Sequence, residues 1–252
     1  MTRATSKQPF IIIQSTKNIF VFSIIHLAVI NEEKTALKLI SEMLKKISVL
    51  DILDHQNKKS KTPLHLAAET QQDESVKILL ECQACPNRLD LEGETPVHIA
   101  ARNNDLETLS HLVLFKVSRP DRGDYLLIYQ INKNCEVNCT TVQADLNIPN
   151  NFGKFPVHLA VEQNLVPVVE MLVSSGVDVE ARDQVSGKTA LHLAVERQLE
   201  EMVTFLVREA RVDMTREDFN GVTAVQAAEK HNSQAIKKII SKELRKQQSP
   251  AQ

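Results

Sequence analysis

One pattern recurs along this chain of 252 residues and constrains its fold more than any other feature. The pattern is Gly-x-Thr-Pro/Ala-Leu/Val-His-Leu/Ile-Ala, and some copies depart from it, with Phe155 at the Thr position of one and Gln226 at the His position of another. Because self-similarity at a regular period indicates an array of stacked units, we interpret the chain as six repeats. Complete or imperfect copies lie at 22–28, 60–67, 93–100, 153–160, 187–194 and 221–227.

The spacing of the copies sets the size of the repeat. Measured at the His position, successive copies are separated by 39, 33, 60, 34 and 34 residues. An interval of 33 or 34 residues is the length of one helix–turn–helix unit. The first interval indicates a lengthened first repeat, and the third indicates an insertion after the third repeat, at about 116–143. The position is occupied by His26, His65, His98, His158, His192 and Gln226.

Each residue type in the pattern suits the start of a helix. A proline such as Pro63 fixes φ in the first helical turn, where its missing N–H is not needed. The preceding threonine, Thr62 in this copy, supplies an N-cap hydroxyl, and the apolar residues that follow begin a stripe that packs on the next unit. We therefore predict one array at 22–247, with a lead-in at 1–21 and a tail at 248–252.

Composition narrows the function classes. Hydrophobic residues make up 42% of the chain, which permits a buried core, and the net charge of −2 provides no basic field for nucleic acid. Aromatic residues make up only 4%, which argues against a base-stacking platform. The apolar run at 10–13 is too short to span a membrane and lacks the cleavage site of a secretory signal. Four cysteines in so long a chain favour a reducing compartment.

Catalysis and metal binding find no support among the motifs. The sequence contains no Gly-rich phosphate loop, no nucleophile elbow and no paired-carboxylate motif in register with the repeats. The recurring histidines are the repeat's own structural position, because no acid–base partner recurs beside them. Cys82 and Cys85 form one pair, and Cys135 and Cys139 form another that is too distant for ordinary zinc spacing. We therefore predict a protein that is not an enzyme and carries no metal or cofactor.

The segment Thr-Pro-Leu-His-Leu-Ala at 62–67, with its period of 33 residues, resembles the ankyrin repeat. This resemblance implies an all-α solenoid of six helix–turn–helix repeats with short β-hairpin fingers, and a long insertion after the third repeat. Arrays of this kind present finger tips and inner-helix ends as one rigid concave strip. The expected function is therefore the binding of another protein.

Two segments narrow the resemblance. Residues 178–196, with one extra residue before Gly187, resemble the fifth repeat of inhibitor-of-kappa-B proteins. The opening at 26–30 and the lengthened first repeat are similar to Rel/NF-κB precursors, with insect proteins as the nearest type. The resemblance implies a cytoplasmic protein, with a nuclear pool left open, that is monomeric when free and contacts neither nucleic acid nor membrane. Its partner would be a Rel/NF-κB dimer, which it would keep off DNA by masking the nuclear localisation segment.

The chain departs from that family at both ends. No Asp-Ser-Gly-x-x-Ser degron lies within residues 1–30, and residues 242–248 are basic where the family has an acidic tail. Three origins therefore stay open: a fragment of a larger Rel precursor, a stand-alone inhibitor or a viral mimic of one. A generic ankyrin adaptor or scaffold for an unrelated protein is the alternative function.

The residues expected to contact a partner lie on the concave strip and the finger tips. Acidic residues near the N-terminal end suit a basic localisation segment, and two aromatic residues at finger tips suit anchors in a partner pocket. The predicted partner-binding residues are Glu32, Glu33, Glu69, Asp73, Asp90, Glu92, Phe152, Asp183, Asp218 and Phe219.

Overall fold

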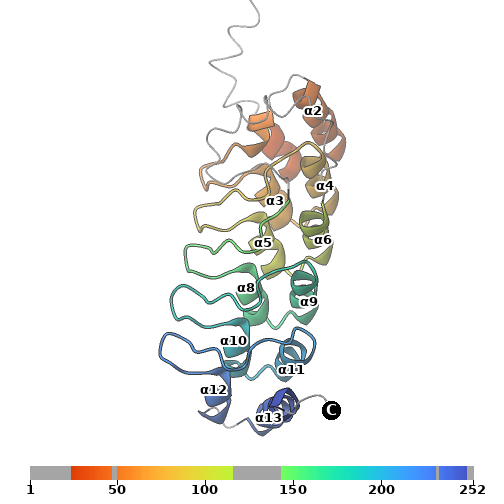
Figure 1. Ribbon diagram of the computed structural model, residues 1–252. Coiled ribbons are helices and arrows are strands. Elements are labelled where there is room, and N and C mark those ends of the chain that lie inside the picture. Colours follow the sequence, from red (N-terminus) through yellow and green to blue (C-terminus); the bar gives the residue numbers. More distant parts are fainter. Residues whose placement is uncertain (1–23, 47–49, 116–142, 231–232, 249–252) are drawn as a thin grey trace, which may run out of the picture.

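The computed structural model describes residues 24–46, 50–115, 143–230 and 233–248, which form a single stack of helix pairs (Figure 1). A first inner helix at 24–30 carries no label in Figure 1. The labelled inner helices are α3 (Pro63–Glu69), α5 (Pro96–Arg102), α8 (Pro156–Glu162), α10 (Ala190–Glu196) and α12 (Ala224–Lys230). The outer helices are α2 (Lys34–Lys46), α4 (Asp73–Glu81), α6 (Leu106–Leu114), α9 (Val166–Ser174), α11 (Glu200–Arg208) and α13 (Gln234–Gln248), and a short 3₁₀ helix, η1 (Leu50–Asp54), follows α2. The all-α solenoid predicted from the repeat is confirmed.

The hydrophobic core is a continuous layer between the inner and outer columns of helices. The same two repeat positions supply much of it: the residue before the histidine on the inner helix, and the residue fourteen after it on the outer helix. Fully burying one such side chain contributes about 1.5–3 kcal/mol to stability. A single helix pair cannot bury its apolar face alone, so each pair depends on its neighbours for stability. These buried residues are Ile25, Leu64, Val97, Val157 and Leu191, and Leu79, Leu112, Leu172, Leu206 and Ile240.

The insertion does not interrupt the stack. Helices on its two sides pack directly, α5 against α8 and α6 against α9. The side chain of Asn87 joins the flanking loops, since it donates to the Gln143 carbonyl and accepts from the Asp145 amide at 2.8 Å. The sequence of the insertion includes a strand-like stretch, Tyr-Leu-Leu-Ile-Tyr at 125–129, which lies outside the described residues.

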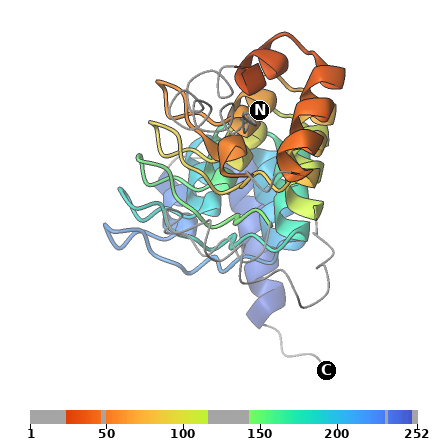
Figure 2. The same ribbon diagram turned by 90° about the horizontal axis from the view of Figure 1, so that it is seen from above.

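The loops between successive helix pairs project from one side as fingers (Figure 2). The sequence predicts short β-hairpins here, but within the described ranges the fingers are tight turns, and their β pairing is limited to one isolated bridge between Glu217 and Thr223. Each finger is joined to the preceding one by a backbone hydrogen bond, for example from the Asn151 amide to the Glu92 carbonyl at 2.9 Å. The fingers therefore form a continuous edge.

The last helix, α13, closes the C-terminal end. Ile236 and Ile240 are buried against the core, and Lys238 and Lys242 are exposed. A polar outer face is what the terminal repeat of a stacked array needs. No helix among the described residues is long and apolar enough to cross a membrane.

Candidate protein-binding surface

An aspartate or asparagine opens every described finger. In each turn the side-chain Oδ1 accepts hydrogen bonds from backbone amides further along the finger, as Asp90 does from Glu92 and Glu94, both at 2.9 Å. Such bonds replace backbone pairing and fix the turn. The residues that open the five described fingers in this way are Asn57, Asp90, Asn150, Asp183 and Asp218.

This arrangement bears on three of the predicted partner-binding residues. Asp90, Asp183 and Asp218 are buried, and their carboxylates are engaged by their own fingers. Burial opposes ionisation of Asp183, but hydrogen bonds from Ser186, Val185 and Lys188 outweigh it and lower the pKa of this carboxyl. The three aspartates thus shape the surface, and we leave them out of the contacting set proposed below.

The recurring histidine caps its own helix and bonds to the next finger. Nδ1 of His65 accepts from the backbone N–H of Thr62 at 3.1 Å, so the ring proton is on Nε2, which donates to the Glu94 carbonyl at 3.0 Å. Because one side chain bonds both to the start of its own helix and to the finger of the next repeat, it holds the two repeats in a fixed relative orientation. The same contact joins His26 to Lys61, His98 to Lys154 and His192 to Val222.

Two repeats depart from this arrangement. The finger after repeat 4 has the extra residue predicted before Gly187, and Nε2 of His158 is left without a hydrogen-bond partner in the described structure. In the last repeat Oε1 of Gln226 accepts a hydrogen bond from the Thr223 amide at 2.9 Å. This bond corresponds to the helix-capping bond of the histidines and not to their bond with the next finger. Gln226 is exposed.

A second recurring contact is an ion pair between the residues four before and four after the histidine. Lys61 pairs with Glu69 at 2.8 Å, so the predicted binding residue Glu69 is partly neutralised within its own repeat. The third repeat has the opposite charges at these two positions, with Glu94 before the histidine and Arg102 after it. Burial raises the pKa of Glu94, although Arg102 opposes that rise. The other pairs are Lys154–Glu162 and Lys188–Glu196.

An acidic cluster lies where the first two inner helices end, and we define it as Glu32, Glu33, Asp73 and Glu74. Gln72 donates to the Val29 carbonyl at 2.8 Å, which places the start of α4 against the end of the first inner helix. Asp73 is half-buried and the other three are exposed. The ion pairs among the described residues involve none of these four carboxylates. The cluster is therefore a negative surface available to a cationic segment.

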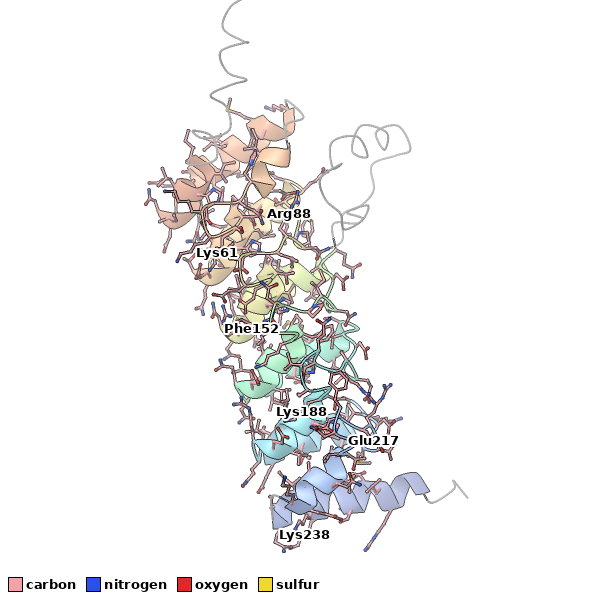
Figure 3. All side chains as sticks on the ribbon, turned by 90° about the vertical axis from the view of Figure 1, so that its left-hand side faces the viewer. Lys61, Arg88, Phe152, Lys188, Glu217 and Lys238 are labelled. Carbon is pink, nitrogen blue, oxygen red and sulfur yellow. The ribbon has the colours of Figure 1, made fainter. Side chains whose placement is uncertain are left out.

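Apolar side chains lie at successive finger tips. Phe152 is 60% exposed and Phe219 is 61% exposed, as expected for predicted contact residues. Leu91 and Val185 are exposed at equivalent tips, although neither is among the predicted anchors. Glu92 is also exposed on this edge. Figure 3 looks onto the edge and shows Phe152 midway along it.

The buried groups of the array are poorly suited to proton transfer. Burial lowers the pKa values of His65, His98 and His158 to about 4, which keeps the rings neutral at neutral pH. Cys82 and Cys85 are buried. Within the ranges that the structure describes, histidine, cysteine and carboxylate side chains form no group of three or more able to hold a metal ion.

Comparison with known proteins agrees with this architecture. A family model described as ankyrin repeats (3 copies) matches residues 25–124 and 117–218. The chain is 29% identical over 166 residues to the nuclear factor NF-kappa-B p105 subunit of Gallus gallus, covering 66% of the chain and 14% of that protein. It is 32% identical over 164 residues to the NF-kappa-B inhibitor alpha of Homo sapiens, covering 64% of the chain and 44% of the relative.

A third relative has a different name. The Rabankyrin-5 of Mus musculus is 32% identical over 143 residues, which cover 54% of the chain and 12% of that protein. The chain thus spans less than half the length of each of these three relatives.

Proposed function

The chain belongs to the ankyrin-repeat family, and from this premise we propose that it binds a Rel/NF-κB transcription factor dimer and keeps it off DNA. The acidic cluster at the N-terminal end would receive the dimer's basic nuclear localisation segment. The finger tips that carry Phe152 and Phe219 would contact the body of the dimer. Such a protein acts in the cytoplasm and performs no chemistry.

The single observation that carries the proposal is the acidic cluster. Its carboxylates come from two neighbouring repeats that Gln72 holds together. Opposite charges attract over about 10 Å at 0.1 M salt, so such a surface would steer a basic segment toward the array. A different role for Asp73 and Glu74 is to stabilise the N-terminal turn of α4. Glu33 directly precedes α2 and has the same role open to it there, whereas Glu32 lies in the connecting turn and is not accounted for in that way.

The names of two relatives add support. One is named an NF-kappa-B inhibitor and the other an NF-kappa-B subunit, and the aligned parts cover about two thirds of this chain. A generic adaptor for an unrelated protein is the second candidate, and the similarity to Rabankyrin-5 favours it. The two candidates differ in whether a Rel dimer binds at all.

Binding kinetics on the immobilised chain test the proposal. Replacing Glu32 and Glu33 by Gln and Asp73 by Asn should slow association of a Rel dimer at low salt and leave dissociation nearly unchanged, because rim charges act chiefly on encounter. Replacing Phe219 by Ala should instead speed dissociation. The matched control neutralises three exposed carboxylates on outer helices, Glu170, Glu200 and Glu201, and should change neither rate. Equal association rates for the acidic-cluster variant and the control variant would contradict the proposal.

A further inference from the structure

The first described repeat forms the N-terminal end of the stack (Figure 1). Apolar side chains on the side away from the second repeat are exposed. Leu39 on α2 is 63% exposed, whereas Ile78, at the same position of the next repeat, is 7% exposed. Leu27 on the first inner helix is 51% exposed, whereas its counterparts in the next two repeats, Leu66 and Ile99, are half-buried and fully buried. We define the open face as Ile24, Leu27, Leu39 and Met43.

The open face has the composition of an interface between repeats. At the position of Ile24, all later repeats bury a proline or an alanine. Met43 is exposed where Cys82 is buried. The opposite end differs, because α13 turns lysines outward. A terminal repeat needs a polar outer face, and the open face lacks one, so it requires a cover. The later residues at the Ile24 position are Pro63, Pro96, Pro156, Ala190 and Ala224.

We propose that residues 10–22 of this chain cover the open face. The repeat register supports this occupant: counted back from the next histidine, residues 10–13 before His26 correspond to 82–85 before His98. In that later repeat Cys82, Ala84 and Cys85 are buried. The corresponding segment Phe-Ile-Ile-Ile is apolar throughout.

The attachment point favours the chain's own segment over a second molecule. Residues 1–23 join directly to Ile24, which is part of the open face, so the effective concentration of the segment there is high. Residues 1–9 correspond to 73–81, the outer helix α4, but they are polar and end in Pro9. The register therefore assigns residues 10–13, and not residues 1–9, to the open face.

Paired substitutions test whether the face is covered. If it is, Leu39→Ser removes a buried side chain and should lower the midpoint of thermal unfolding by about 5 °C. The control, Leu91→Ser, changes the same residue type at a finger tip of similar exposure (62%) and should leave the midpoint unchanged. Equal midpoints for the two variants would show that the face is open to solvent, which overturns the proposal.

Changes in the segment identify what covers the face. Replacing Ile11, Ile12 and Ile13 together by Ser should lower the midpoint as Leu39→Ser does and increase binding of a hydrophobic dye. Replacing Thr5, Ser6 and Gln8 by Ala is the control and should do neither. Combining the isoleucine changes with Leu39→Ser should lower the midpoint of thermal unfolding by less than the sum of the two separate shifts, because both changes remove the same contact.

Sedimentation of the full chain tests the other occupant. The proposal predicts a monomer whose sedimentation is unchanged by Leu39→Ser. A dimer that Leu39→Ser dissociates, and that the isoleucine changes leave intact, would show that a second copy covers the face and would overturn the proposal. Destabilisation by Leu39→Ser without any effect of the isoleucine changes would overturn it as well.

Discussion

Nε2 of His192 lies 3.0 Å from the carbonyl oxygen of Val222, thirty residues further along the chain. Nδ1 of the same ring accepts from the amide of Thr189, the N-cap of α10. One imidazole ring thus bonds both to a helix start and to a finger carbonyl of the next repeat. The bond is between repeats, so its loss weakens the coupling on which a stacked array depends.

The cost of removing this histidine should depend on the repeat. His192→Ala loses the bond to Val222 and should reduce the free energy of unfolding by about 1–2 kcal/mol. His158→Ala should cost less, because Nε2 of His158 has no partner to lose in the described structure. Urea unfolding of both variants measures the difference, and a larger loss for His158→Ala would contradict this account.

Stability should fall as the pH falls from 7 to 5. The pKa values of His65, His98 and His158 are lowered by burial from 6.5 to about 4, so the unfolded chain binds protons in this window while the folded chain does not. Stability then rises with pH between about 4 and 6.5. Each histidine should account for about 2 kcal/mol between pH 7 and 5, partly offset by Glu94, whose pKa is raised.

Urea unfolding at pH 7 and pH 5 measures this dependence. His158→Gln provides the matched variant, since glutamine does not titrate, and it should remove about a third of the loss. Unfolding midpoints that coincide at the two pH values would show that these rings are not held neutral.

Gly187→Ala should cost more stability than Gly221→Ala. Both glycines have φ of +72°, so an alanine pays the same backbone penalty of about 1–2 kcal/mol at each. A Cβ at Gly187 would overlap the ring and the backbone nitrogen of Phe219, whereas nothing lies within 4 Å at Gly221. The difference between the two urea midpoints therefore reports how closely the neighbouring finger packs. Equal costs would mean that the fingers separate in solution.

The reversed ion pair should tolerate a double exchange better than either single change. Arg102→Glu places two carboxylates together, one of them on the buried Glu94, and should cost about 3 kcal/mol. Glu94→Lys places two cations together. The double variant restores the polarity of Lys61–Glu69 and Lys188–Glu196, so most of the stability should return. Additive losses in this cycle, followed by urea unfolding, would show that the two side chains act independently.

The helices could be predicted from the sequence because their signals are local. Proline or alanine after an N-cap threonine, followed by apolar residues at fixed positions, marks α3, α5 and α10, and the structure begins them at Pro63, Pro96 and Ala190. The signal of the outer helices is local as well, because their apolar residues recur at helical spacing, as in α2 and α11.

The roles of the finger aspartates could not be inferred from their charge. Asp90 and Asp218 look like surface carboxylates in the sequence, yet both accept amides within their turns. The signal that identifies them is spacing, because each lies eight residues before the His position. The open face depends on contacts between repeats, which no local pattern specifies. The Glu94–Arg102 pair lies within one repeat, and its sequence signal is opposite charges four residues before and four after the histidine.

The central claim is that this chain removes a Rel/NF-κB dimer from DNA. The most direct measurement titrates a DNA-bound Rel dimer with the full chain and follows the free DNA by mobility shift. The account predicts that DNA is released as the chain approaches a stoichiometric amount, and that the displaced dimer is retained on the immobilised chain. If a tenfold excess displaces no dimer from a panel of Rel dimers, and none is retained, the chain is an adaptor for another protein.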